Sequence, residues 1–170
     1  YYWLLKIVDS SGTLTLTWMP LSYNYPTLTG KVSPNDMRVD TQNGTRIYIT
    51  GNMSGYCEIG DGGFVVVSNS LTSVIRYQIL SGTYSSGPDL KVAVPWYRSG
   101  GARNGNHVMF YGPSLHVSGV NYCGVYSTNG GATFSLLNTG ALSNIVPALI
   151  VPDAVTESAY RVFFSDISFG

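Results

Sequence analysis

Charged residues are scarce in this sequence. Aspartate, glutamate, lysine and arginine make up only 11% of its 170 residues, and nine acidic and nine basic residues give a formal net charge of zero. An ordinary soluble domain contains roughly 25% charged residues. Because a nucleic-acid-binding protein needs a surplus of basic residues to neutralise phosphates, we expect no direct nucleic-acid binding by this segment.

Cysteine and histidine are also scarce. The two cysteines, Cys57 and Cys123, lie far apart and show no metal-ligand spacing, and the chain has only two histidines. A structural zinc site needs about four such ligands, and no glycine loop that could cradle a phosphate opens a helix. We therefore expect no metal and no other cofactor. The sequence leaves open whether Cys57 and Cys123 form a disulfide.

Long hydrophobic runs are absent as well. No apolar stretch approaches the roughly 18–20 residues that a membrane-spanning helix needs. The chain begins with the sequence Tyr-Tyr-Trp-Leu-Leu, without an initiator methionine or the charged region of a signal peptide. We therefore expect the segment to come from the interior of a longer product.

The sequence is rich in β-strand patterns. Residues 13–18 alternate between threonine and an apolar residue, which places Leu14, Leu16 and Trp18 on one face of a strand. β-Branched and aromatic residues dominate further short segments, separated by clusters of Gly, Pro, Asn and Ser. These segments are 46–50, 63–67, 73–80, 90–96, 107–111, 115–118, 122–126, 132–137 and 160–169. The pattern predicts one all-β domain over residues 1–170, an antiparallel β-sandwich of jelly-roll-like form.

Helix signals are nearly absent from the chain. The best candidates are about one turn at residues 35–39, directly after Pro34, and a second turn near residues 140–146. Neither segment is long enough to change the predicted all-β class.

Tyrosine, with 13 residues, is the most abundant aromatic residue. A surface poor in charge and rich in tyrosine favours close packing against other proteins, because tyrosine supplies contact area at low entropic cost. Aromatic faces beside amide and hydroxyl groups also suit sugar binding. Alternatively, many of the tyrosines fill the core of the sandwich, and the sequence leaves these alternatives open.

The most distinctive local pattern covers residues 127–134, which read Ser-Thr-Asn-Gly-Gly-Ala-Thr-Phe. It resembles the Asp-box of sialidases and related β-propellers, with Asn129 at the position of the aspartate. The resemblance implies a hairpin turn in which the polar third side chain bonds turn amides, glycine takes a positive φ and the final aromatic residue packs below. We assign a structural and not a catalytic role to the motif positions Ser127, Asn129, Gly131, Thr133 and Phe134. An ordinary hairpin turn explains the same residues.

Candidate catalytic residues are few. Ser114, His116 and Ser118 would lie on one face of a strand, where a serine–histidine contact is sterically allowed and Asp61 or Asp89 could orient the imidazole. However, the sequence contains no Gly-x-Ser-x-Gly nucleophile elbow, and no two of its carboxylates stand in a glycosidase signature. A strand face turned to solvent explains the three residues better, so we treat them as a candidate polar surface cluster and predict that the chain is not an enzyme.

Three segments are similar to parts of picorna-like virus capsid proteins, the eight-stranded jelly rolls that tile small icosahedral shells. Residues 11–20 resemble a strand that follows a small-residue turn and ends in a Trp-x-Pro element, here Trp-Met-Pro. Residues 88–97 end in Val-Pro-Trp-Tyr and look like the strand that a proline terminates at a subunit contact. Residues 160–170 resemble a late strand with an Asp-x-Ser-Phe-Gly ending. Their order fits the family, and the spacing implies an inserted or protruding hairpin layer around residues 27–87.

This resemblance implies a structural coat domain that mediates shell assembly, host-cell attachment or both. Its partners would be other copies of itself or sibling capsid proteins, together with a host receptor or glycan. Its location would be the virion, an extracellular particle assembled in the host cytoplasm. The alternative is a carbohydrate-binding or sialidase-like β domain of the phage-tail or adhesin type, favoured by the Asp-box-like turn and the many aromatic residues. A hydrolase that uses His107 or His116 ranks third.

Overall fold

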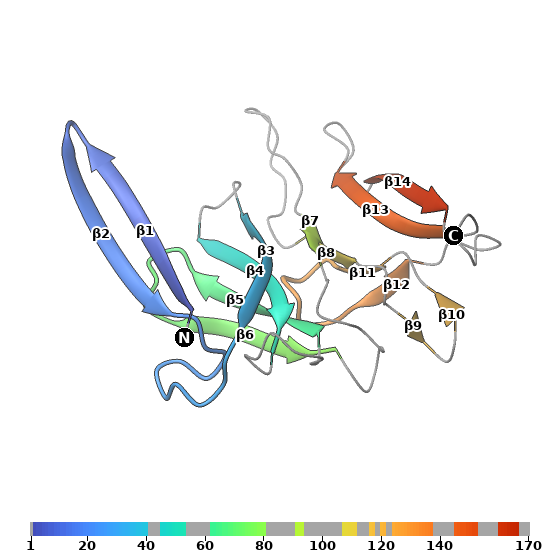
Figure 1. Cartoon of the computed structure of the whole chain (residues 1–170), viewed down its shortest axis with the longest axis horizontal. Helices are drawn as coiled ribbons and strands as arrows, with labels where there is room; N and C mark the ends of the chain where they lie inside the picture. The colour runs from blue at the N-terminus through green and yellow to red at the C-terminus, as the bar shows by residue number, and fades with distance from the viewer. Residues whose placement is uncertain are drawn as a thin grey trace.

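Antiparallel β-strands form the regular secondary structure of the chain in a computed structural model (Figure 1). The structure describes residues 2–40, 45–53, 62–80, 91–93, 107–111, 116–117, 120–121, 124–137, 145–152 and 160–166. The strands are β1 (Trp3–Ser10), β2 (Thr13–Pro20), β3 (Ser33–Val39), β4 (Arg46–Asn52), β5 (Gly62–Ser68), β6 (Val74–Ile79), β7 (Lys91–Ala93), β8 (Val108–Tyr111), β9 (His116–Val117), β10 (Val120–Asn121), β11 (Gly124–Ser127), β12 (Ser135–Leu137), β13 (Ile145–Pro152) and β14 (Tyr160–Asp166). The all-β prediction is confirmed, and within these described ranges no helix is long and apolar enough to cross a membrane.

A four-stranded antiparallel sheet of β3, β4, β5 and β6, in that order, forms the centre of the molecule. Its two central strands are β4 and β5, and nearly all of their residues are buried. The run Phe64-Val65-Val66-Val67 in β5 is apolar without alternation because both faces of this strand are covered. Val65 and Val67 point to one side of the sheet, and Phe64 and Val66 point to the other.

The second four-stranded sheet, in the order β12-β11-β8-β7, packs on the Phe64 side of the first. The rings of Phe64 and Phe110 are stacked, with centroids 4.3 Å apart and an angle of 13° between planes. Phe134 contacts both rings. The core between the sheets consists of Tyr48, Phe64, Val66, Leu80, Val92, Val108, Phe110 and Val125. This arrangement is a β-sandwich with interdigitated side chains.

The N-terminal part of the chain covers the opposite face of the first sheet. The bases of β1 and β2 and the loop that follows them bury the Val65 side against a second apolar cluster. This cluster consists of Met19, Leu21, Val32, Ile47, Ile49, Met53, Val65, Val67 and Leu71. The first sheet therefore has a core on each side, which explains why the central residues of β4 and β5 are mostly apolar.

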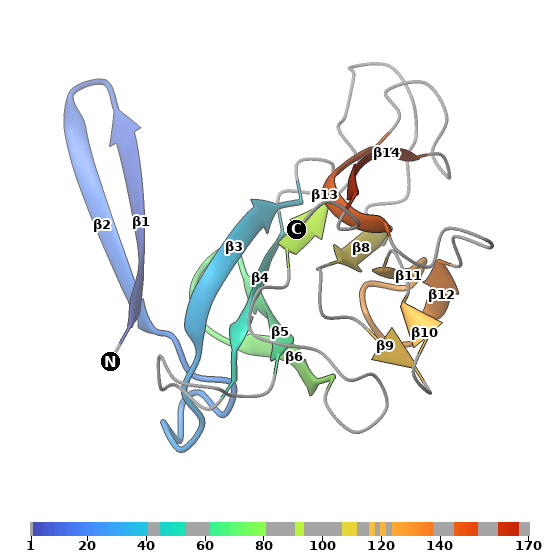
Figure 2. The same cartoon turned by 45° about the vertical axis from the view of Figure 1, so that its right-hand side comes forward.

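The connections within the two sheets are simple. Strands β3 to β6 follow one another as a meander, and β7, β8, β11 and β12 do so as well, with the small β9–β10 hairpin inserted between β8 and β11. No Greek-key connection occurs among the described strands, so the jelly-roll order stays a prediction. The four strands of the first sheet lie within the interval 27–87, whereas the hairpin that projects from the body is β1–β2, which precedes this interval (Figure 2).

Two short helix predictions were wrong where the structure describes them. Residues 35–39 belong to β3, which pairs with β4 and has a β-bulge between Pro34 and Asp36. Pro34 is tolerated because β3 is an edge strand, so its missing amide disrupts no ladder on the outer side. Ile145 and Val146 begin β13, which pairs with β14, and residues 140–144 lie outside the described residues.

Candidate functional site

The β1–β2 hairpin is the candidate site, and its two strands are joined by a tight turn. Ser10 pairs with Thr13, so the loop contains only Ser11 and Gly12. Both residues have positive φ values, 53° and 87°, as a type I′ turn requires. The carboxylate of Asp9 accepts a hydrogen bond from the amide of Gly12 at 2.9 Å. The turn fixes the register of two strands of eight residues each, and each strand spans roughly 27 Å.

This register gathers large apolar side chains on one face of the hairpin. Leu5 pairs with Trp18, Ile7 with Leu16, and directly paired residues point to the same face. We call the surface formed by Trp3, Leu5, Ile7, Leu14, Leu16 and Trp18 the apolar hairpin face. The other face carries one lysine and three threonines, namely Lys6, Thr13, Thr15 and Thr17. The sequence pattern therefore predicts correctly that Leu14, Leu16 and Trp18 share a face.

The apolar hairpin face is exposed. Leu14 exposes 64% of its surface, Trp3 60%, Ile7 58% and Trp18 56%, and Leu16 and Leu5 are exposed as well. Together these six side chains present on the order of 700 Å², which exceeds the roughly 300–600 Å² of the largest apolar patch on a typical monomer. Exposed apolar patches of this size mark interaction sites.

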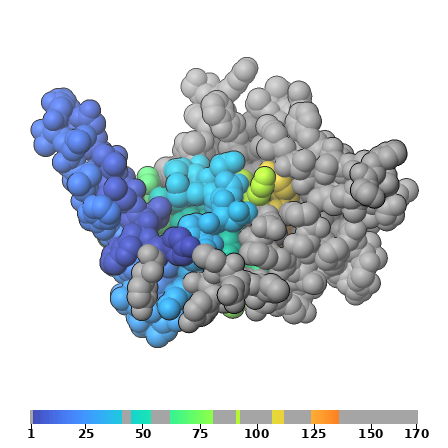
Figure 3. Space-filling model, in the orientation of Figure 1, coloured from blue at the N-terminus to red at the C-terminus, as the bar shows by residue number. Residues whose placement is uncertain are grey.

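The base of the hairpin is fixed to the body, whereas its tip projects away. The ammonium group of Lys6 donates a hydrogen bond to the carbonyl oxygen of Asn69 at 2.8 Å. The amide of Leu21 donates to the carbonyl oxygen of Tyr2 at 2.8 Å, and Leu4 and Met19 pack into the second apolar cluster. Figure 3 shows the hairpin projecting from the body as an arm.

A groove lies between the base of the hairpin and the edge strand β3. Its volume is about 370 Å³, and Trp3, Leu4 and Leu21 line it on the hairpin side. Residues 34–37 and Ile49 line it on the side of the sheet. Because Trp3 belongs both to the groove and to the apolar hairpin face, the apolar surface continues from the arm to the body.

The structure brings the five Asp-box-like residues together between β11 and β12. The Oγ atom of Ser127 accepts hydrogen bonds from the amides of Asn129 and Gly131, at 3.2 and 2.8 Å, and donates to Asn129 Oδ1 at 2.9 Å. Asn129 Oδ1 also accepts from the amides of Ala132 and Thr133, and Asn129 Nδ2 donates to Thr133 Oγ1 at 2.8 Å. Gly131 has a φ of 86°, and a side chain there would press on the Phe64 ring. The turn therefore lies against the sandwich core, where Phe134 contacts Phe64 and Phe110.

The other sequence candidates contribute no described site. Ser114, Ser118 and both cysteines, Cys57 and Cys123, lie outside the described residues. His116 is described only by its backbone position at the start of β9, where it pairs with Asn121. Among the described residues no group of three or more His, Cys, Asp and Glu side chains is placed to hold a metal ion.

Sequence reasoning missed the apolar hairpin face as a site. The alternation in β2 is a signal of two-faced structure, but it normally means that the apolar face is buried. Comparison with protein-family models, with curated proteins and with solved structures finds no match to this chain. Its function has to be inferred from its own residues and their arrangement.

Proposed function

We propose that this chain is a structural, non-catalytic coat domain that assembles in a virion with copies of itself or with sibling coat proteins. The observation that carries the assembly role is the apolar hairpin face, which protrudes from the body and exposes two tryptophans. The coat role is supported by the resemblance of residues 11–20, 88–97 and 160–170 to capsid segments and by the low charge of the chain.

The physical case for a partner begins with the stability of the hairpin. A two-stranded hairpin alone is marginally stable in water, and β1 and β2 form a sheet of only two strands. Within the described part of the chain, the core holds the hairpin at its base, through Leu4 and Met19. The distal half therefore gains stability when a partner covers its apolar face, because burial of apolar surface is the dominant favourable term in association.

A second copy of the chain fits this face best. Two hairpins that pack face to face, related by a two-fold axis, would bury on the order of 1,400 Å², which lies within the range of a standard interface. Such an interface is self-complementary, and the paired positions on this face carry one charged residue, Asp9, beside the turn. If the two hairpins of this pair run antiparallel, the tip of one hairpin would lie over Trp3 and the groove of the other.

Light scattering of the purified chain tests the proposal. The variant carrying Ile7→Thr and Leu16→Thr keeps two β-favouring residues but removes apolar surface from the centre of the face. We expect an oligomer for the unsubstituted chain and a monomer with unchanged circular dichroism for the double variant.

A matched control is Val8→Thr, because Val8 is 43% exposed on the opposite face of the same strand. This control should remain oligomeric. A monomeric unsubstituted chain at all concentrations, from a parent protein that forms no particles in electron micrographs, would overturn the proposal.

A further inference from the structure

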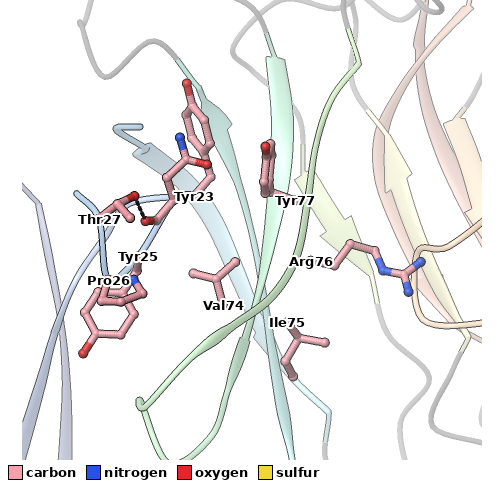
Figure 4. A pocket seen from close by; sticks show the side chains of 9 residues that line it. Tyr23, Tyr25, Pro26, Thr27, Val74, Ile75, Arg76 and Tyr77 are labelled. Atoms are coloured by element: carbon pink, nitrogen blue, oxygen red, sulfur yellow. Dashed lines mark hydrogen bonds between the residues drawn. The ribbon is translucent and has the colours of Figure 1, made fainter. Parts of the chain in front are cut away.

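A second surface feature lies between the loop after the hairpin and strand β6. It is a shallow pocket of about 530 Å³, lined by residues 23–27 and 74–77, and this volume is within the roughly 300–1,000 Å³ of small-molecule sites. Tyr23 and Tyr77 stand at one end, Tyr25 and Pro26 lie at the other, and Val74 lies between them (Figure 4). The pocket therefore presents an apolar floor between aromatic side chains from two distant parts of the chain.

The loop side of the pocket is held in place by hydrogen bonds within the loop. The amide of Asn24 donates to Ser22 Oγ at 3.3 Å, and Asn24 Nδ2 donates to Thr29 Oγ1 at 2.8 Å. The carbonyl oxygen of Asn24 accepts from both the amide and the hydroxyl of Thr27. A loop that is ordered before binding loses less entropy when a ligand arrives.

The ring of Tyr23 is fixed from two sides. It lies directly on the backbone of Gly30, where a β-carbon would overlap the ring. Its centroid is 4.9 Å from that of Tyr77, with an angle of 37° between the planes. Tyr77 itself remains 46% exposed. One aromatic side chain is therefore anchored, and its neighbour offers a free surface beside it.

Charge is nearly absent from the pocket. Among the described residues that line it, Arg76 is the only charged one, and its guanidinium group points away from Tyr23 and Tyr25 (Figure 4). Arg76 pairs with Val66, whose side chain lies in the core between the sheets, so the two residues share that face of the strand. Among the described lining residues, no cationic group faces Tyr23 and Tyr25 to pair with an anionic ligand.

We propose that this pocket binds a neutral sugar of a glycan. Aromatic faces pack against the apolar C–H surface of a pyranose ring, and the hydroxyls of the three tyrosines and the side-chain oxygen of Asn24 match its hydroxyl groups. No described lining residue points a cation into the pocket, which separates this site from one for sialic acid. The inference is independent of the assembly role, since none of the lining residues belongs to the apolar hairpin face.

A glycan array that carries neutral and sialylated glycans, followed by saturation-transfer NMR with the free monosaccharides, tests the inference. We expect signals for glycans with a neutral terminal hexose and a dissociation constant of about 1 mM for the monosaccharide. Tyr77→Ala should weaken binding about tenfold, because it removes a stacking partner. A tenfold change in the dissociation constant corresponds to about 1.4 kcal/mol. Tyr77→Phe should retain the stacking contribution.

Two further variants make the test specific to the pocket. Val39→Ala is the control, because Val39 is 39% exposed on the opposite edge strand of the same sheet and lines neither the pocket nor the groove beside the hairpin. It should leave sugar binding unchanged. Gly30→Ala should weaken binding by displacing the Tyr23 ring. The inference is overturned if no neutral sugar binds, if only sialylated glycans bind, or if Val39→Ala weakens binding as much as Tyr77→Ala. The oligomeric state, measured on the same variants, reports on the assembly role separately.

Discussion

The carboxylate of Asp36 joins the two sheets of the sandwich, because its Oδ2 atom accepts a hydrogen bond from the amide of Val92 at 3.1 Å. The other oxygen, Oδ1, accepts from the amide of Met37 at 2.9 Å and from the guanidinium of Arg38 at 2.7 Å. Asp36 directly follows the β-bulge in β3, and bulges re-aim side chains. The bulge therefore allows a side chain of an edge strand to reach β7 of the other sheet.

Removal of this carboxylate should destabilise the sandwich. We expect Asp36→Ala to lower the free energy of unfolding by about 1–3 kcal/mol, because the Val92 amide loses its acceptor in a partly buried place. Arg38→Ala is the control, since Arg38 is largely exposed and an exposed ion pair contributes about 0–1 kcal/mol. Urea denaturation measures both variants. Equal losses for the two would mean that the ion pair, and not the link to Val92, carries the effect.

The hydroxyl of Tyr48 is buried between the sheets without a hydrogen-bond partner among the described residues. Burial raises the pKa of this hydroxyl above its ordinary value of 10.0, and the nearby Arg46 acts in the opposite direction. An unpaired buried polar group costs about 1–3 kcal/mol. We therefore expect Tyr48→Phe to leave stability at neutral pH unchanged or to increase it by about 1 kcal/mol.

The pH dependence of the same variant follows from linkage. Below pH 10 the Tyr48 hydroxyl is protonated in both the folded and the unfolded chain. Above pH 10 the unfolded chain loses this proton first, so the contribution to stability falls as the pH rises through the raised folded pKa. Thermal unfolding from pH 8 to about pH 11 should show a steeper loss for the unsubstituted chain than for Tyr48→Phe. Parallel profiles would contradict the raised pKa.

Local pattern was sufficient to predict many of the strands but not their surroundings, and it missed β1, β3 and β13. The alternation at residues 13–18 predicts a strand and its two faces correctly, because it depends only on the period of two. The wrong helix turn at residues 35–39 has a long-range cause. The pairing of Pro34 with Gly51 and the bulge next to it depend on a strand that lies later in the chain, and a β-carbon at Gly51 would clash with the carbonyl group of Ser33.

The two surfaces proposed for binding were not predictable for the same reason. An apolar face in the sequence indicates burial, and only the fold shows that, among the described residues, the apolar clusters of the body include the hairpin at its base alone. The tyrosine pocket combines residues 23–27 with residues 74–77, about 50 positions apart. The Asp-box-like turn is different, because Ser127, Asn129 and Thr133 contact one another within one short loop.

That turn should accept an aspartate in place of Asn129. Asn129→Asp retains the acceptor for the amides of Ala132 and Thr133, and the hydroxyl of Thr133 can donate to the carboxylate. We expect a change in unfolding free energy within about 0.5 kcal/mol for Asn129→Asp and a loss of about 1–3 kcal/mol for Asn129→Ala. Differential scanning fluorimetry compares the two. If the alanine variant is as stable as the aspartate variant, the hydrogen bonds of this side chain do not hold the turn.

The hydrogen bond from Lys6 to the carbonyl oxygen of Asn69 should govern the mobility of the hairpin. Lys6→Met keeps an apolar stem of similar length but removes the donor, and a net loss of about 1 kcal/mol corresponds to roughly fivefold faster local opening. Hydrogen exchange of the amides in β1 and β2 should therefore accelerate about fivefold, while exchange in β4 and β5 stays unchanged.

Lys91→Met is the matched control for this experiment, because it removes one exposed lysine charge at a distance from the hairpin. Equal acceleration in both variants would assign the effect to charge and not to the Lys6–Asn69 bond. Because a mobile arm must be ordered when a partner binds, Lys6→Met should also shift the oligomer toward monomer although it leaves the apolar hairpin face intact. If the amides of β1 and β2 exchange faster in Lys6→Met but the affinity of assembly is unchanged, the Lys6–Asn69 bond does not pre-organise the hairpin for assembly.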